Sequence, residues 1–101
     1  MGETLPFMLQ RLDLMPMAMT KLQKPISSYL RENLFYTFGG FNYTQTFLDL
    51  FLHVGAERIM FSADYPYSSM TDAKRFLDQL PISPQNRKLI AHGNAEQLLR
   101  L

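Results

Sequence analysis

The sequence contains no cysteine, so it can form neither a disulfide framework nor a metal site built from thiolates. The sequence also lacks an excess of charge of either sign, because the formal net charge is +1. No basic stripe is present that could neutralise nucleic-acid phosphates. No apolar run approaches the roughly 20 residues that a membrane-spanning helix needs. These absences predict a cytoplasmic protein with neither a nucleic-acid partner nor a membrane partner.

The residues that are present form a chain that can fold. Hydrophobic residues make up 47% and charged residues 19% of the 101 positions, which is an ordinary globular balance with no sign of disorder. A chain of this length forms one domain at most.

Two short segments, residues 34–38 and 58–62, have the composition of buried strands. Neither shows the alternation with polar residues that is typical of a half-exposed strand. Near-continuous hydrophobicity is typical of parallel sheets, because helices cover both of their faces. Residues 44–54 lie between the two segments and carry apolar residues at helical spacing, with Thr44 as the expected N-cap and Gly55 as the expected left-handed C-cap. The pattern predicts a right-handed strand, helix, strand crossover.

Helices are also expected on both sides of this crossover. Before it, helices are expected over residues 5–15 and over residues 24–33, the second entered through Pro25. After it, one helix is capped by Thr71 and stopped by Pro81, and another begins at Ser83 and ends at Gly93. A capping box of Asn94 and Gln97 opens the last helical turns. Two strands do not form a sheet that is stable alone, because both of its edges expose unpaired backbone groups. We therefore expect neighbouring strands that this chain does not contain.

Three methionines, Met15, Met17 and Met19, lie close together around Pro16. Methionine fills irregular gaps, so we expect this cluster to pack in the core between two helical pieces. A substrate-contacting loop is the alternative interpretation.

Four separated motifs indicate a family. They are GETLPFMLQRLD, LFYTFGGFN, GAERIMFSADYPY and IAHGNAEQLLRL. In this order and spacing they resemble the C-terminal part of the amidohydrolase-related metalloenzymes, the group that contains γ-resorcylate decarboxylase, 2,3-dihydroxybenzoate decarboxylase and aminocarboxymuconate semialdehyde decarboxylase. The resemblance runs the full length of the chain.

The resemblance implies an α/β fold, namely the C-terminal portion of a TIM (β/α)8 barrel with two parallel strands and flanking helices. Residues 1–101 would then be one segment that contains strands seven and eight of the barrel. A complete barrel takes about 250 residues. In the family a histidine stands two residues before the match to Gly2 and Glu3, and here only Met1 precedes them, so we expect that histidine to be cut off.

Asp64 directly follows the second apolar segment, where a buried strand ends and a loop begins. From this pattern alone it is either a turn residue that caps the following loop or a working carboxylate. The resemblance matches Asp64 to an aspartate that ligates a divalent metal and relays a proton, and a carboxylate suits both tasks. We therefore predict a metal-binding and catalytic Asp64.

Three further residues take a role from the resemblance. Glu3 matches a glutamate that supports the missing histidine, although its residue type also suits an exposed first helical turn. Arg11 matches a position facing the substrate's carboxylate, and a surface arginine on an amphipathic helix is the alternative. Tyr67 matches an aromatic wall of the pocket and could equally be a packing residue.

The two histidines and the paired glycines suggest other sites, which we do not predict. His53 and His92 lie on expected helices and away from the ends of strands, so we expect structural or surface roles. Gly39 and Gly40 lack the Gly-x-Gly-x-x-Gly pattern of a phosphate cradle, and we expect them to permit close backbone approach at a pocket rim.

The first functional hypothesis is a metal-dependent decarboxylase or hydrolase that acts on small aromatic or unsaturated carboxylic acids with Zn²⁺ or Mn²⁺. Decarboxylase is preferred, because the Leu-Pro-x-Met-x-x-Arg-x-Asp run resembles that branch. The alternative is a catalytically silent barrel fragment, or a piece that completes a partner's barrel. A catalytic metal needs about three protein ligands, so we expect the isolated chain to be inactive and to bind no divalent ion tightly. We also expect a homo-oligomer or a partner that carries the N-terminal part of the barrel.

An aspartyl phosphotransferase that uses Asp64 as its nucleophile is a third hypothesis. It is disfavoured, because no second aspartate stands two residues later. The threonine and lysine companions of such enzymes are also missing at recognisable positions.

Overall fold

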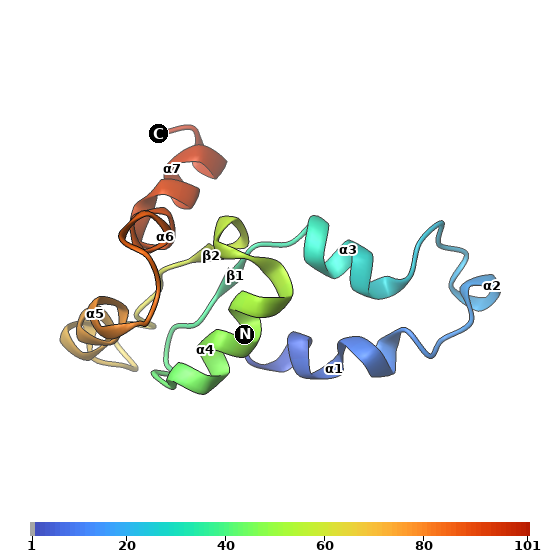
Figure 1. Ribbon diagram of the computed structural model, residues 1–101, viewed down its shortest axis with the longest axis horizontal. Coiled ribbons are helices and arrows are strands. Elements are labelled where there is room, and N and C mark those ends of the chain that lie inside the picture. The colour runs from blue at the N-terminus through green and yellow to red at the C-terminus, as the bar shows by residue number, and fades with distance from the viewer. Residues whose placement is uncertain (1) are drawn as a thin grey trace.

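The computed structural model describes residues 2–101 (Figure 1). The elements in chain order are α1 (Thr4–Leu12), α2 (Met17–Thr20), α3 (Ile26–Glu32), β1 (Tyr36–Thr37), α4 (Thr44–Val54), a 3₁₀ turn (Ala56–Arg58), β2 (Ile59–Met60), α5 (Met70–Gln79), α6 (Pro84–Lys88), a π-helical turn (Leu89–Gly93) and α7 (Asn94–Leu99). The molecule is elongated, with extents of 47 × 28 × 27 Å. We call β1, β2 and α4 to α7 the body, and α1 to α3 the arm, which extends to one side of it in Figure 1.

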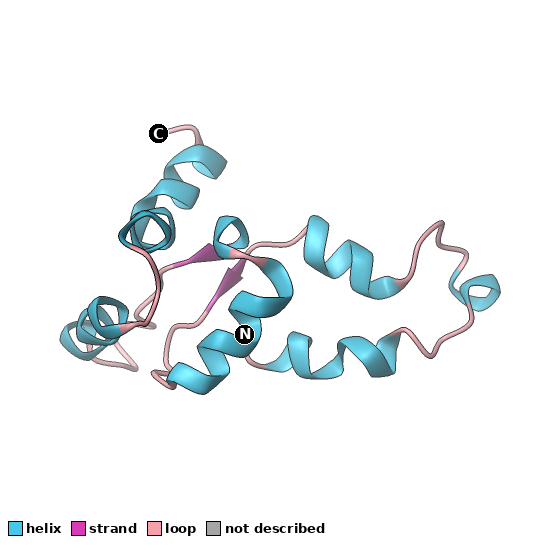
Figure 2. Ribbon diagram, in the orientation of Figure 1, coloured by secondary structure: helices cyan, strands magenta, loops and turns pink. Residues whose placement is uncertain are grey.

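The body is built around two parallel strands with α4 as the crossover between them (Figure 2). Tyr36 pairs with Ile59 and Thr37 pairs with Met60. The predicted parallel pair is confirmed, but the predicted ranges 34–38 and 58–62 are too long. A continuous apolar run reports burial, whereas pairing depends on which backbone groups meet. Beyond Met60, the N–H of Phe61 donates to the carbonyl of Ile90 at 2.8 Å, outside the sheet.

The core of the body lies where α4, α5 and the strands meet. The ring of Phe38 packs edge to face on Phe47 of α4 at 5.2 Å between centroids and on Phe76 of α5 at 5.9 Å. Leu50 and Ile59 are fully buried beside them. Burial of each such side chain contributes about 1.5–3 kcal/mol. This core fixes the positions of the strand ends, from which the candidate site projects.

The caps of α4 differ from the prediction. Tyr43 is the N-cap, and Thr44 is already the first helical residue and makes no capping hydrogen bond. Gly55 ends the helix with φ 81°, as predicted for a glycine, but its ψ of 166° is extended and not left-handed helical. That conformation leads the chain directly into the 3₁₀ turn, so Arg58 lies in the turn and not in a strand.

The helices after β2 also begin and end at residues other than some of those predicted. Ser69, and not Thr71, caps α5, because its hydroxyl accepts the N–H of Asp72 at 3.2 Å. Ser83 caps α6 as predicted. The predicted stop at Gly93 is wrong: Gly93 is helical at φ −57° and ψ −44°, and the helix runs on into α7. The expected capping box at Asn94 is not formed in the described chain, because the side-chain amide of that residue donates to the carbonyls of Ala56 and Ile59 instead.

The arm is a pair of helices, α1 and α3, joined by a long connection that contains α2. Ser27 donates its backbone N–H to Asp13 Oδ1 at 2.9 Å, which ties the two helices together. Tyr36 Oη donates to the carbonyl of Leu30 at 2.6 Å and links the arm to β1, and burial raises the pKa of this phenol. α1 ends at Leu12, before the predicted residue 15.

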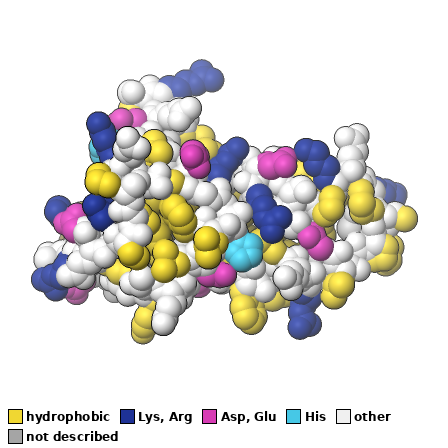
Figure 3. Space-filling model, in the orientation of Figure 1, with side chains coloured by type: hydrophobic (Ala, Val, Ile, Leu, Met, Phe, Trp, Pro, Cys, Tyr) yellow, Lys and Arg dark blue, Asp and Glu magenta, His cyan; other side chains and the backbone are white. Residues whose placement is uncertain are grey.

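The methionine cluster lies at the tip of the arm and not in the core. Met15, Met17 and Met19 are 48%, 45% and 74% exposed, so the prediction that they pack in a core is wrong for the described chain. Apolar side chains gather at this end of the molecule in Figure 3. None of the helices in the described residues reaches the length and apolarity that crossing a membrane requires.

Candidate functional site

Asp64 lies in the loop that follows β2, four residues after the strand's last paired residue. Its φ is +60°, in the left-handed region where aspartate is enriched among residues other than glycine. Its carbonyl accepts the N–H of Ser68 at 3.0 Å, which closes a tight turn. The turn is thus made by the backbone of Asp64, and the exposed carboxylate is left available for another task.

The two glycines that follow β1 make room for this loop. A Cβ at Gly39 would lie 2.6 Å from Ser62 Oγ, and a Cβ at Gly40 would lie 3.1 Å from Asp64 Oδ2. Gly40 also has φ +85°, a conformation that glycine adopts without strain. The expected close backbone approach is confirmed, and it places the Asp64 carboxylate over the end of β1.

Glu3 enters the same end of the sheet from the start of the chain. The N–H of Gly2 donates to the carbonyl of Thr37, the last residue of β1, at 3.0 Å. Glu3 follows as the half-buried N-cap residue of α1, and Thr4 Oγ1 donates to its Oε1 at 3.4 Å. The structure therefore brings Glu3 and Asp64 to the carboxyl end of the two strands. In barrels, working residues sit at this end.

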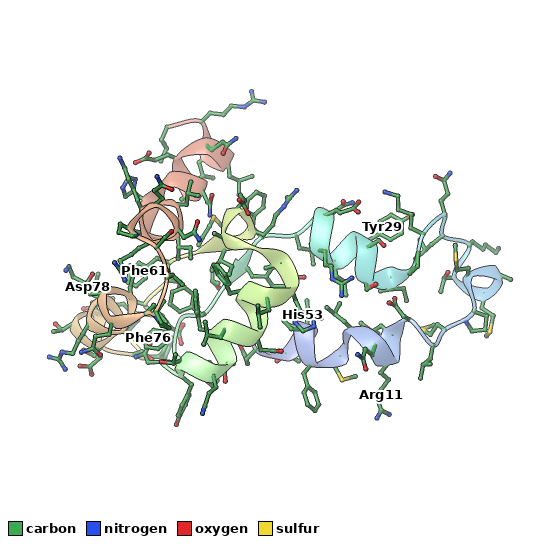
Figure 4. All side chains as sticks on the ribbon, viewed as in Figure 1. Arg11, Tyr29, His53, Phe61, Phe76 and Asp78 are labelled. Carbon is green, nitrogen blue, oxygen red and sulfur yellow. The ribbon has the colours of Figure 1, made fainter. Side chains whose placement is uncertain are left out.

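Arg11 and Tyr67 do not join these carboxylates in a common pocket. Arg11 lies in the last turn of α1, exposed, and Figure 4 shows it pointing away from α3. It stands about 10 Å along the helix from Thr4, given the 1.5 Å rise of each residue. Tyr67 belongs to the turn that begins at Asp64, but its side chain is 89% exposed and lines no closed wall in this part of the chain.

Both histidines bond to acceptors on their own helices. His53 Nδ1 lies 2.8 Å from the carbonyl of Asp49 on α4. His92 Nδ1 lies 2.9 Å from Glu96 Oε1. Their predicted positions away from the strand ends are confirmed, although His92 stands within the π-helical turn and not near a helix end.

The described residues supply too few donors for a complete metal site. Among residues 2–101, no group of three or more His, Cys, Asp or Glu side chains converges in the way that would hold a metal ion. Asp64 offers a hard oxygen donor of the kind that Mn²⁺ accepts. A catalytic site needs about three protein ligands. These residues therefore fit as one contributor to a metal site and do not complete it.

A cavity lies at the other end of the strands. It has a volume of about 470 Å³ and is lined by Phe35, Glu57, Arg58, Asn94, Gln97, Leu98 and Arg100. The guanidinium of Arg58 stacks over the ring of Phe35, 4.9 Å from its centroid. Phe35 and Arg58 directly precede β1 and β2, so this cavity opens at the amino end of the sheet, away from Asp64.

The sequence interpretation missed Asn94. It assigned the residue to a cap, whereas the side chain is 3% exposed and donates to two carbonyls on the body. One signal was present in the sequence, because Gly93 and Asn94 interrupt an otherwise regular helical pattern without a proline or a polar cluster.

Comparison with known proteins gives a consistent result. A family model described as amidohydrolase matches residues 2–101. The γ-resorcylate decarboxylase of Rhodococcus jostii is 37% identical over 107 residues, which cover 100% of this chain and 32% of that protein. The chain thus spans about a third of the length of the curated relatives it matches.

Solved structures agree with this comparison. A crystal structure of 2,6-dihydroxybenzoate decarboxylase complexed with 2,6-dihydroxybenzoate matches with a TM-score of 0.86 and 34% identity, covering 99% of this chain and 32% of that one. A dihydroxybenzoic acid decarboxylase from Polaromonas sp. JS666, with bound manganese and the inhibitor 2-nitroresorcinol, matches with a TM-score of 0.83 and 32% identity. That match covers 96% of this chain and 31% of the other.

Proposed function

The chain belongs to the amidohydrolase family, and from that premise we propose that it forms the C-terminal third of a (β/α)8 barrel decarboxylase of small aromatic carboxylic acids. Residues 1–101 would be one segment of that barrel, with β1 and β2 as its last two strands. The complete barrel is the assembly in which the remaining strands join these two.

One observation carries the proposal more than any other: Asp64 stands at the carboxyl end of β2 with its backbone at φ +60° and its carboxylate over Gly40. Sparsely populated backbone conformations cluster at active sites, where surrounding structure holds them. In this proposal Asp64 ligates the metal. Its other role is to hold and transfer a proton at a carboxylate oxygen.

The other residues take supporting roles in the proposal. Glu3, at the same strand end, would orient a histidine supplied by the rest of the barrel. Arg11 would bind the substrate's carboxylate through its planar guanidinium, and Tyr67 would form an aromatic wall. Both lie on exposed segments of the described chain, so both roles require contacts with the remaining strands.

The proposed ion is Mn²⁺, because a related dihydroxybenzoic acid decarboxylase binds manganese. Zn²⁺ is the second candidate, since Asp64 can ligate either ion. When bound, such an ion polarises the substrate's oxygen atoms and stabilises negative charge. As the bond between ring and carboxylate breaks and CO₂ leaves, the electron pair stays on the ring carbon and takes a proton. The carboxylate of Asp64 is the group of this chain that can hold that proton.

The test is Asp64→Asn in the complete barrel. The amide keeps the shape of the side chain but can neither carry the charge nor transfer the proton, so we expect a folded protein without turnover. Asp78→Asn is the matched control, because Asp78 is an exposed carboxylate on α5 that pairs with Lys74 at 2.9 Å. Turnover at the native rate in the Asp64 variant would reject the proposal.

A second candidate is a catalytically silent segment that completes a partner's barrel, or that pairs with a second copy of itself. It is favoured by the single metal ligand named among the described residues. Elemental analysis of the purified chain tests this candidate, because one tightly bound equivalent of manganese or zinc would contradict a silent segment. Light scattering reports whether the chain assembles with itself.

A further inference from the structure

The π-helical turn and α7 together make three hydrogen bonds to the segment that contains the 3₁₀ turn, β2 and Phe61. Asn94 Nδ2 donates to the carbonyl of Ala56 and to that of Ile59, each at 2.7 Å. The N–H of Phe61 donates to the carbonyl of Ile90 at 2.8 Å, and that carbonyl lies in the π-helical turn. Such turns recur at functional sites.

The buried side chain of Asn94 connects α7 to the 3₁₀ turn and to β2. Its side chain is 3% exposed, and its amide nitrogen has two hydrogens, each of which serves one carbonyl. The bonded residues are 35 and 38 positions away in sequence. A buried amide that uses both of its donors on backbone oxygens fixes the separation between a helix and a strand, because displacement of either element breaks buried hydrogen bonds.

The strand that Asn94 bonds, β2, leads directly to Asp64. Phe61 is fixed from the helical side, and the next residue, Ser62, packs against Gly39 so closely that a Cβ there would lie 2.6 Å from its Oγ. Two residues on, the Asp64 carboxylate lies against Gly40. The strand end is therefore held between the helix on one side and β1 on the other. Displacement of the helical side would move the carboxylate.

We propose that Asn94 is a positioning residue for Asp64: its two hydrogen bonds fix β2 so that the carboxylate meets the metal in the geometry that binding requires. This inference rests on the proposed function, because it assumes the metal role of Asp64. Residues that orient a metal ligand without touching the metal typically change metal affinity by 10–100-fold when mutated. Asn94 acts in this way through the backbone of its neighbour strand.

The first measurement uses the chain as it is and needs no metal. In Asn94→Leu, which has a similar volume and no donor, we expect the backbone amides of residues 61–64 to exchange with solvent at least about tenfold faster, since the strand end loses its anchor. Gln97→Leu is the matched control, because Gln97 is an exposed amide on the same helix. It should leave exchange at these four amides unchanged.

The second measurement is the Mn²⁺ affinity of the complete barrel, with the electron paramagnetic resonance signal of the ion as the readout. We expect Asn94→Leu to raise the Kd for Mn²⁺ about 10–100-fold while circular dichroism remains native, and Gln97→Leu to leave it unchanged. Asn94→Ser keeps one hydroxyl donor and should fall between the native protein and the leucine variant. A merely structural role would not produce this graded change in a folded protein.

Each outcome decides the matter. A folded Asn94→Leu with native Mn²⁺ affinity overturns the inference while the proposed function stands, provided that Asp64→Asn weakens binding in the same assay. If Asp64→Asn leaves the affinity unchanged, the proposed function fails and the inference fails with it. If the leucine variant does not fold, the serine variant decides by the same criterion. If neither folds, Asn94 is a folding residue and the positioning role is wrong.

Discussion

The body and the arm differ in how they use their apolar side chains. In the body, the rings of Phe38, Phe47 and Phe76 pack on one another and the strands are buried between helices. In the arm, Phe7, Leu14 and Met19 are 85%, 80% and 74% exposed. The predicted site residues divide in the same way, because Asp64 projects from the body and Arg11 from the arm. A rigid core supports the proposed metal ligand, whereas the proposed substrate-binding arginine depends on neighbours outside residues 2–101.

The largest expected effect compares a buried side chain of the body with an exposed side chain of the arm. Phe47→Ala should lower the free energy of unfolding by about 3–5 kcal/mol, because it removes a ring that is 2% exposed and leaves a cavity. Met19→Ala in the arm should change it by less than about 0.5 kcal/mol. Urea denaturation of the two variants measures both values. Equal losses would mean that the arm tip is packed after all.

A second comparison concerns two glycines within the body. Gly40→Ala should cost about 1–2 kcal/mol, because its φ of +85° strains any side chain and the Cβ would lie 3.1 Å from Asp64 Oδ2. Gly93→Ala should be no less stable than the native chain, since Gly93 has helical angles. Its Cβ would lie 3.3 Å from the flexible end of Leu89 and at an ordinary contact distance of 3.6 Å from the carbonyl oxygen of Lys88. Thermal unfolding orders the two variants, and a Gly93 variant less stable than the Gly40 variant would contradict this structure.

The cap of α5 gives a third, smaller effect. Ser69→Ala removes the acceptor for the N–H of Asp72 and should destabilise the body by about 1 kcal/mol. Thr71→Ala, at the cap position expected from the sequence, should stay within about 0.5 kcal/mol of the native chain. Chemical denaturation of both variants distinguishes the two assignments. The reverse order would restore Thr71 as the cap.

The smallest effect concerns the arm and pH. Hydrogen bonds from the Ser27 hydroxyl and backbone N–H, and then the charge of Arg31, hold the pKa of Asp13 below its ordinary value of 3.8. A carboxylate with a lowered pKa in the folded state stabilises that state above its unfolded pKa, and this contribution is lost as pH falls through the folded pKa. The native chain should therefore be slightly more stable than Asp13→Asn at pH 7, and the difference should shrink below pH 3.8. Denaturation of the two proteins at pH 7 and at a pH below 3.8 measures this difference in stability. A difference that grew on acidification would contradict the prediction.

The sequence predicted those parts of the body that depend on local pattern. The crossover helix, the parallel pair and the cap at Ser83 follow from spacing and from residue types that a few neighbours determine. The four-motif resemblance also led to Asp64, whose position at the end of β2 the structure bears out. Its role as a metal ligand stays a prediction.

The features that could not be predicted depend on distant partners. Asn94 bonds to residues 35 and 38 positions away, so local capping rules assigned it wrongly. The strands are shorter than their apolar runs, because pairing requires a neighbour at each position and burial does not. The methionines were placed in a core because their type suits one, yet all three are exposed in the described chain.

The most direct test of the account is a Mn²⁺ binding isotherm for the complete barrel, measured for the native protein, Asp64→Asn and Asp78→Asn. If the aspartate at the end of β2 is a metal ligand, Asp64→Asn should raise the Kd at least about tenfold, while Asp78→Asn should match the native value. Native affinity in a folded Asp64→Asn protein would contradict the account.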